Sequence, residues 1–237
     1  MTCIDESMTI FKLNSDFIFP DPTQAEPDGL LAIGGDLQIK RILLSYSMGI
    51  FPWYSDGQPI LWWSPDPRLI ILPHSLHRSK SLKRVIKSKK YEVKFDQCFD
   101  TIVELCSKVE RRGQNGTWIT DEMFAAYSKL HKAGFAHSVE CYYKGQIVGG
   151  LYGVSLGGGF FGESMFSLKS DASKICLATL SEKLLEMNFD FIDCQIPTDH
   201  LKRMGAFEID RKEFLIRLRR TLDKPTYSGN WAPLSSN

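Results

Sequence analysis

Residues 136–154 read AHSVECYYKGQIVGGLYGV, and this stretch sets the architecture of the second half of the chain. Two segments rich in β-branched and aromatic residues, 136–143 and 146–154, flank a Lys144-Gly145 turn, which predicts an antiparallel hairpin. A third strand is expected over 159–164, at the end of a run of three glycines. The hairpin and this strand would form an antiparallel sheet.

The chain beyond this sheet predicts a helix over about 172–187 and a strand over 189–194 that returns to the sheet. Strands packed against a helix in this order indicate an α/β sandwich of the N-acyltransferase type. We therefore predict an α+β fold. A small N-terminal α/β domain, rich in aromatic residues, would occupy residues 1–65, and a larger C-terminal acetyltransferase-like (GNAT-type) α/β sandwich would occupy residues 66–237.

Residues 49–68 carry a high density of rigid aromatic side chains, because three of the five tryptophans fall within these twenty residues. The tryptophans add large flat surfaces with few rotatable bonds, and four prolines stiffen the backbone that presents them. Such a segment predicts a preformed apolar pocket or a stacking platform. The alternative is that the tryptophans stabilise a small domain without long strands by packing in its core.

A basic segment follows, since no acidic residue occurs between Pro67 and Tyr91 while eight Lys and Arg residues accumulate there. A helix over about 76–88 would turn Leu82, Val85 and Ile86 inward and place on one face the cations Lys80, Lys83, Arg84 and Lys87. Like charges at these spacings repel one another without a counter-ligand, which favours phosphate binding. The alternative is a solvated face with distant acidic partners.

Composition limits the remaining possibilities. The chain has 237 residues with 43% hydrophobic and 24% charged residues, which is typical of a globular protein with a substantial core. No apolar run is long enough for a membrane span or a signal peptide, so we expect no membrane association and a location in the cytosol. The six cysteines form no C-x-x-C pair and the five histidines no H-E-x-x-H motif, so no metal site is expected.

Polar residues capable of chemistry gather at the predicted ends of two strands, in FFGESMFS (160–167) and FIDCQ (191–195). Because strand side chains alternate, Asp193 and Gln195 should point to the same face. Glu163 would meet them if the two strands are neighbours. Burying such groups costs free energy unless they are hydrogen-bonded, so either a ligand site or a self-satisfied polar cluster is expected.

Several long segments together resemble the leucyl/phenylalanyl-tRNA-protein transferase family. They occur in the family's order between about residues 19 and 218, and they are EPDGLLAIGGDL (26–37), GIFPW (49–53), LWWSPDPR (61–68), GTWIT (116–120), HSVE (137–140), GESMFS (162–167), ASK (172–174), IDCQ (192–195) and GA (205–206). The resemblance implies an enzyme that moves Leu, Phe or, less readily, Met from its tRNA onto the N-terminal Arg or Lys of a protein, which marks that protein for degradation. It also implies an acetyltransferase-like C-terminal domain.

The resemblance further implies roles for individual residues. Asp193 and Gln195 would orient and polarise the attacking amine, and Glu163 would hold the acceptor or the aminoacyl group. The aminoacyl side chain would enter an apolar pocket formed by Trp53, Leu151, Phe160, Met165, Leu177, Leu180, Leu184 and Ile192. Trp118 would stack on the terminal adenine of the tRNA, whose backbone would contact Lys80, Arg84 and Lys87.

The reaction itself requires no cofactor, because an aminoacyl ester is already activated and its attack by an amine needs neither ATP nor a metal. Orientation of the two substrates can supply on the order of 7 kcal/mol or more. Two rival functions remain open. An acyl-coenzyme A N-acetyltransferase would need a glycine-rich phosphate loop at the head of the central helix, but the corresponding residues 166–172 contain no glycine. A non-catalytic RNA- or peptide-binding module would bind the same partners without turnover.

Overall fold

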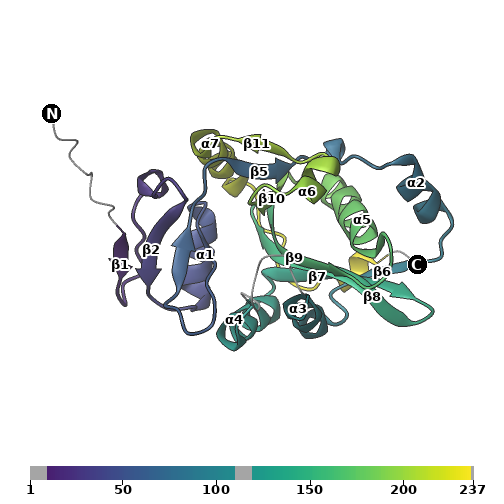
Figure 1. Ribbon diagram of the computed structural model, residues 1–237, viewed down its shortest axis with the longest axis horizontal. Coiled ribbons are helices and arrows are strands. Elements are labelled where there is room, and N and C mark those ends of the chain that lie inside the picture. Colours follow the sequence, from purple (N-terminus) through teal and green to yellow (C-terminus); the bar gives the residue numbers. More distant parts are fainter. Residues whose placement is uncertain (1–9, 110–118, 236–237) are drawn as a thin grey trace.

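The computed structural model describes residues 10–109 and 119–235, and it has a mixed α and β architecture with two sheets (Figure 1). In this part of the chain the smaller sheet has four strands in the order β1-β2-β4-β3, namely β1 (Phe11–Leu13), β2 (Leu30–Gly34), β3 (Phe51–Pro52) and β4 (Leu61–Trp63). Helix α1 (Ile39–Ser47) connects β2 to β3. The aromatic segment therefore supplies two short strands and the loops beside them.

The larger sheet has seven strands within the described ranges, in the order β11-β5-β10-β9-β8-β7-β6. Their bounds are β5 (Arg68–Ile71), β6 (Glu92–Phe95), β7 (Ala136–Tyr143), β8 (Gln146–Leu156), β9 (Gly159–Ser167), β10 (Phe191–Gln195) and β11 (Phe207–Ile209). Strands β7, β8 and β9 are antiparallel, and β10 returns parallel to β9. The predicted three-stranded antiparallel unit and the returning strand are thus confirmed, and β9 is three residues longer than expected.

The hairpin forms for the expected reason. Lys144 and Gly145 both have positive φ angles, 51° and 77°, which suit the tight turns whose twist matches that of antiparallel strands. Strand β8 then alternates, so that Leu151 and Tyr152 enter hydrophobic clusters on opposite faces of the sheet. Both faces of this strand are consequently buried.

Helices cover both faces of the larger sheet (Figure 1). Helix α5 (Ala172–Glu186) packs against β7, β8 and β9 on one face, and α3 (Phe99–Ser107) and α4 (Asp121–Lys132) pack on the other. Gly149 and Gly150 permit this close approach, since an added Cβ would lie 2.6 Å from the Cβ of Ala172 and 2.7 Å from Cδ1 of Ile102, respectively. The remaining helices are α2 (Lys80–Lys87), α6 (Asp199–Arg203) and α7 (Arg211–Leu222), with short 3-10 turns at Pro22–Gln24, Pro73–Ser75 and Ala232–Leu234.

The basic helix differs from its prediction. Helix α2 begins at Lys80 rather than near residue 76, because the Ser79 side chain accepts a hydrogen bond from the backbone N–H of Leu82 and so caps the first turn. Leu82 is buried as expected, but Ile86 is 36% exposed rather than turned inward. Helix α2 is therefore anchored to the protein chiefly by Leu82.

Among the described residues, no helix is both long and apolar enough to cross a bilayer. Within residues 10–109 and 119–235, no group of three or more His, Cys, Asp or Glu side chains is arranged to hold a metal ion.

Candidate active site

One cavity of about 480 Å³ lies where the aromatic segment meets the ends of β9 and β10. The aromatic segment contributes Phe51, Pro52 and Trp53, and the larger sheet contributes residues of β8, β9 and β10. Its volume falls within the range usual for small-ligand sites, about 300–1,000 Å³. Residues more than 100 positions apart in sequence thus form one concave site.

The two parallel strands β9 and β10 explain why polar groups reach this cavity. Their pairing runs from Phe191 opposite Gly159 to Asp193 opposite Phe161 and ends there. Glu163 and Gln195 lie just beyond the last pair, and both line the cavity. The expectation that Glu163 would meet the polar residues of β10 is therefore realised through neighbouring strands.

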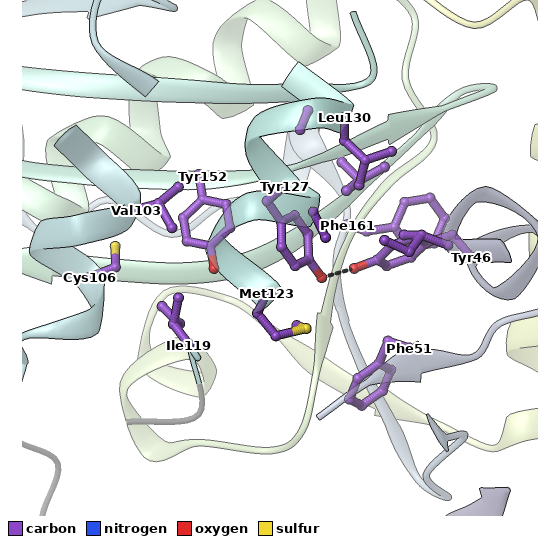
Figure 2. Packing of buried hydrophobic residues seen from close by; sticks show 14 of the residues in the cluster. Tyr46, Phe51, Val103, Cys106, Ile119, Met123, Tyr127, Leu130, Tyr152 and Phe161 are labelled. Carbon is purple, nitrogen blue, oxygen red and sulfur yellow. Dashed lines mark hydrogen bonds between the residues drawn. The ribbon is translucent and has the colours of Figure 1, made fainter. Parts of the chain in front are cut away.

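Glu163 is the centre of a hydrogen-bonded network. Its Oε1 accepts hydrogen bonds from the Tyr46 hydroxyl at 2.6 Å and from Nε2 of Gln195 at 2.9 Å, and its Oε2 contacts the Tyr127 hydroxyl at 2.8 Å. The two tyrosine hydroxyls lie 2.6 Å apart, as Figure 2 shows with a dashed line. Burial raises the pKa of Glu163 to about 7, against the opposing effect of its three hydrogen-bond donors. Burial likewise raises the pKa of both tyrosines well above the usual value, so they keep their protons.

Asp193 has a different environment. Its side chain is fully buried and accepts two hydrogen bonds from Arg68, from Nε at 2.9 Å and from a terminal guanidinium nitrogen at 2.7 Å. The Arg68 guanidinium also lies over the rings of Phe51 and Phe214, at 4.8 and 4.5 Å from their centroids. The Asp193 carboxylate is thus paired with Arg68, a cation 125 positions away in the sequence, and strand alternation alone does not predict this pair.

Gln195 is held in an unusual backbone conformation, and simple strand alternation does not apply to it. A register shift between Asp193 and Gln195 interrupts the pairing with β5, and Gln195 has a φ angle of 63°. Its backbone N–H donates to Oδ1 of Asp193 at 2.9 Å, which holds this left-handed residue in place. Asp193 therefore orients Gln195, whose side chain then reaches Glu163.

The apolar wall of the cavity contains most of the side chains expected there. Those that line it are Trp53, Leu151, Phe160, Met165, Leu177, Leu180 and Ile192. Leu184 does not line the cavity, because it lies one turn further along α5 than Leu180 and is fully buried in the hydrophobic cluster beneath the helix. Helical periodicity could not separate the two leucines, since both point to the same side of α5.

The expected nucleic-acid contacts lie elsewhere. Lys80, Arg84 and Lys87 are exposed on α2, at the end of the molecule away from the four-stranded sheet (Figure 1), and none of them lines the cavity. Trp118, the expected partner of the terminal adenine, lies outside the described residues. The rim of the cavity instead includes Thr198 and His200, at the start of α6.

Three residues of the site went unrecognised in the sequence, namely Tyr46, Arg68 and Tyr127. Arg68 had a detectable signature, because a cation directly before the apolar strand residues Leu69, Ile70 and Ile71 requires a buried counter-charge. Tyr46 and Tyr127 had none. Each lies on the apolar face of its helix, where a tyrosine usually serves only packing.

The chain is similar to proteins of one family along most of its length. Residues 35–66 match the family profile described as leucyl/phenylalanyl-tRNA protein transferase N-terminal domain, and residues 70–219 match leucyl/phenylalanyl-tRNA protein transferase. A protein named leucyl/phenylalanyl-tRNA–protein transferase from Anaeromyxobacter sp. (strain Fw109-5) is 54% identical over 224 residues, which cover 94% of this chain and 95% of the relative. One of the same name from Desulfatibacillum aliphaticivorans is 52% identical over 230 residues, 97% of this chain and 99% of the relative.

Similarity to solved structures is much lower. The structure of L-PGS from Bacillus licheniformis aligns with 71% of this chain and 53% of its own, at 13% identity and a TM-score of 0.37.

Proposed function

The chain belongs to the leucyl/phenylalanyl-tRNA–protein transferase family, and from this premise we propose that the cavity beside Glu163 and Gln195 is where the aminoacyl group meets the acceptor amine. The protein is an aminoacyltransferase, with aminoacyl-tRNA as donor and a protein as acceptor. The acceptor begins with Arg or Lys, and the transferred residue is Leu, Phe or, less readily, Met. Both substrates support a cytosolic location.

One observation supports placing the reaction in this cavity. A single cavity combines a wall of apolar side chains with a pair of hydrogen-bonded polar groups, Glu163 and Gln195. The apolar wall suits the side chain of Leu or Phe, and the polar pair suits an amine and a cationic side chain. A buried carboxylate next to a cation also gains electrostatic energy that it would not gain in water.

In the proposed reaction the acceptor's α-amine attacks the ester carbonyl of the aminoacyl-tRNA. A C–N bond forms, the C–O bond to the ribose breaks, and the proton lost by the amine balances the proton gained by the ribose oxygen. The Gln195 amide orients the amine, and the Glu163 carboxyl holds the cationic side chain of the acceptor's first residue. Asp193, paired with Arg68, acts through Gln195 rather than on the substrate.

The fold and its proposed division into two domains support the same function. We assign residues 1–65 to an N-terminal domain and residues 66–237 to an acetyltransferase-like (GNAT-type) catalytic domain. The four-stranded sheet ends at Trp63 and the seven-stranded sheet begins at Arg68, which favours a boundary between them. Three antiparallel strands followed by a helix and a parallel returning strand favour the acetyltransferase-like assignment.

The acyl-coenzyme A alternative finds no support at the start of α5. Asp171 occupies the N-cap position there, and its carboxylate pairs with Lys174 at 2.8 Å. A carboxylate at this position repels a pyrophosphate, whereas a phosphate cradle exposes backbone N–H groups. The binding-module alternative differs from the transferase only in lacking turnover.

The assignment is tested by incubating the full-length protein with labelled Leu-tRNA and a peptide that begins with Arg. We expect label on that peptide and none on a matched peptide that begins with Gly. Binding of both substrates without transfer would indicate a binding module, and absence of label in both reactions would overturn the assignment.

The cations of α2 provide a separate prediction. Lys80→Ala combined with Arg84→Ala should weaken tRNA binding and flatten its salt dependence, because each phosphate contact adds about 0.9 to the slope of log affinity against log salt. The matched control is Arg219→Ala with Arg220→Ala, two exposed cations on α7, which lies apart from α2 (Figure 1). Equal slopes for the two double variants would exclude α2 as the phosphate-binding surface.

Leu180 and Leu184 provide a matched pair for substrate selection. Leu180→Ala should enlarge the cavity and raise transfer of Phe relative to Leu by about tenfold, since a single methylene in an apolar pocket is worth about 1–3 kcal/mol. Leu184→Ala should lower the free energy of unfolding by about 2–5 kcal/mol and leave the Phe/Leu ratio unchanged. The ratio is measured by competition between the two charged tRNAs, and equal shifts in both variants would contradict the assigned cavity wall.

A further inference from the structure

The oxygens of Glu163, Tyr46 and Tyr127 form a closed ring whose protons can be counted. Three contacts join these groups, namely Tyr46 to Glu163 at 2.6 Å, Tyr127 to Glu163 at 2.8 Å and Tyr46 to Tyr127 at 2.6 Å. Each contact is short enough to require a hydrogen between the two oxygens. The two phenols supply one hydrogen each. An ionised Glu163 would leave the third contact as two oxygens facing each other without a proton.

A proton on Glu163 resolves this shortage. Its Oε2–H then donates to Tyr127, the Tyr127 hydroxyl donates to Tyr46, and the Tyr46 hydroxyl donates to Oε1 of Glu163, so that each group donates once and accepts once. Gln195 Nε2 donates to Oε1 at 2.9 Å in either protonation state. All oxygens of the ring are thereby satisfied without an external ligand.

We propose that Glu163 is protonated in the free enzyme, where it closes this ring with Tyr46 and Tyr127, and that it releases the proton to solvent when the cationic side chain of the acceptor's N-terminal Arg or Lys binds. This inference rests on the proposed function, because it takes the acceptor cation to be the group that Glu163 meets. It assigns to Tyr46 and Tyr127 a positioning role that the family assignment does not include.

The groups around Glu163 are consistent with a carboxyl group that is protonated in the free enzyme and ionised when the acceptor binds. Burial raises the pKa of Glu163 to about 7, and the nearby charge of Asp193 acts in the same direction. Arg68, which donates two hydrogen bonds to Asp193, offsets part of the Asp193 charge, so burial is the main cause of the raised pKa. The other titratable groups around the cavity are Tyr46 on α1, Tyr127 on α4, Tyr152 on β8, Cys194 on β10 and His200 on α6.

The expected change on binding is large enough to measure. A cation within hydrogen-bond reach lowers the pKa of a carboxyl group by about one to three units. A shift of about two units would take Glu163 at about pH 6 from mostly protonated to mostly ionised. An acceptor whose first residue has no cationic side chain would leave the ring closed.

Infrared spectroscopy of the full-length protein tests the inference directly, because a protonated carboxyl group has its own C=O band. We expect a band at about pH 6 that disappears as the pH rises through about 7 and that is missing in Glu163→Gln. The spectrum of Glu163→Gln is subtracted from that of the wild type, because burial also raises the pKa of Glu140, on β7, to about 7 and this group can give a similar band. A wild-type spectrum without any Glu163-dependent band at about pH 6 would overturn the inference.

Phenylalanine variants test the ring. Tyr46→Phe or Tyr127→Phe removes a donor to the ionised carboxylate, and each should move the midpoint of the Glu163 band upward by about one pH unit or more. The matched control is Tyr54→Phe, which removes a phenol that contacts a different carboxylate, Glu122, at 3.2 Å. Midpoints unchanged in both ring variants would contradict the proposal.

Peptide binding tests the release of the proton. At a constant pH of about 6, a peptide that begins with Arg should abolish the Glu163 band, and a peptide that begins with Gly should leave it intact. If label transfer proceeds but the band persists with bound Arg peptide, the inference fails and the proposed function stands. If the band is present but no label is transferred to either peptide, the proposed function fails.

Discussion

Asp193→Ala should destabilise the protein more than any other single substitution considered, by about 3–5 kcal/mol in the free energy of unfolding. The carboxylate is fully buried, and its partner Arg68 is 1% exposed. Removing one member of a buried ion pair leaves the other charge without a partner in a medium of low dielectric constant, which is the source of this penalty. Chemical denaturation monitored by tryptophan fluorescence measures the change.

Two controls distinguish this mechanism from a general sensitivity to charge removal. Glu213→Ala breaks the exposed pair between Glu213 and Arg217 on α7 and should cost only about 0.3–0.5 kcal/mol. Replacing both buried charges, with Arg68→Met and Asp193→Leu, should cost less than Asp193→Ala alone, because no unpaired charge remains. Equal destabilisation by Asp193→Ala and Glu213→Ala would show that the Arg68–Asp193 pair has no special role.

Gln195→Ala is expected to have the largest effect on catalysis, with turnover reduced by about 10²–10³-fold and tRNA affinity unchanged. The Gln195 amide is the polar group of β10 that reaches Glu163 inside the cavity, and loss of a preorganised hydrogen-bonding group at a reacting centre typically has an effect of this size. Single-turnover transfer from Leu-tRNA measures the rate, and a separate binding assay measures the affinity for tRNA.

Gln195→Gly separates the side chain from the backbone. Glycine adopts a φ angle near 63° without strain, whereas alanine does not, so Gln195→Gly should fold at least as stably as Gln195→Ala. Both variants lack the amide and should lose turnover to the same extent. Recovery of turnover in Gln195→Gly would show that the bend in β10 matters rather than the amide.

These two predictions together reassign the role of Asp193. A loss of activity in Asp193 variants would be a consequence of a disordered β10 end, since Asp193 contacts Arg68 and the backbone of Gln195. The measurements distinguish the roles, because Gln195 variants should lose rate at nearly unchanged stability and Asp193 variants should lose stability first.

The sequence alone was sufficient for the elements with strong local patterns. Alternating apolar residues and a turn of two residues predicted the β7–β8 hairpin, and apolar residues at helical spacing predicted α5. Asp210 and Glu213 form a local capping pattern of the same kind at the start of α7, where the Asp210 side chain accepts a hydrogen bond from the backbone N–H of Glu213. Each of these features depends on residues within a few positions of one another.

Long-range packing decided the rest. Strand β5 inserts between β10 and β11 and thereby brings Arg68 to Asp193, 125 residues further along the chain. Helices α1 and α4 bring Tyr46 and Tyr127 together although they are 81 positions apart. The bend at Gln195 exists because the Asp193 carboxylate accepts its backbone N–H, and no strand periodicity predicts such a bend.

The sequence by itself determined the elements with strong local patterns, the family and the polar residues Glu163 and Gln195. It did so because propensity, capping and alternation act over short distances along the chain. Only the tertiary structure decided which groups share the cavity, that Asp193 is neutralised by Arg68, and that Glu163 lies within reach of two phenols. Burial and charge pairing depend on neighbours that folding brings from distant parts of the chain, and these neighbours determine the protonation of Glu163.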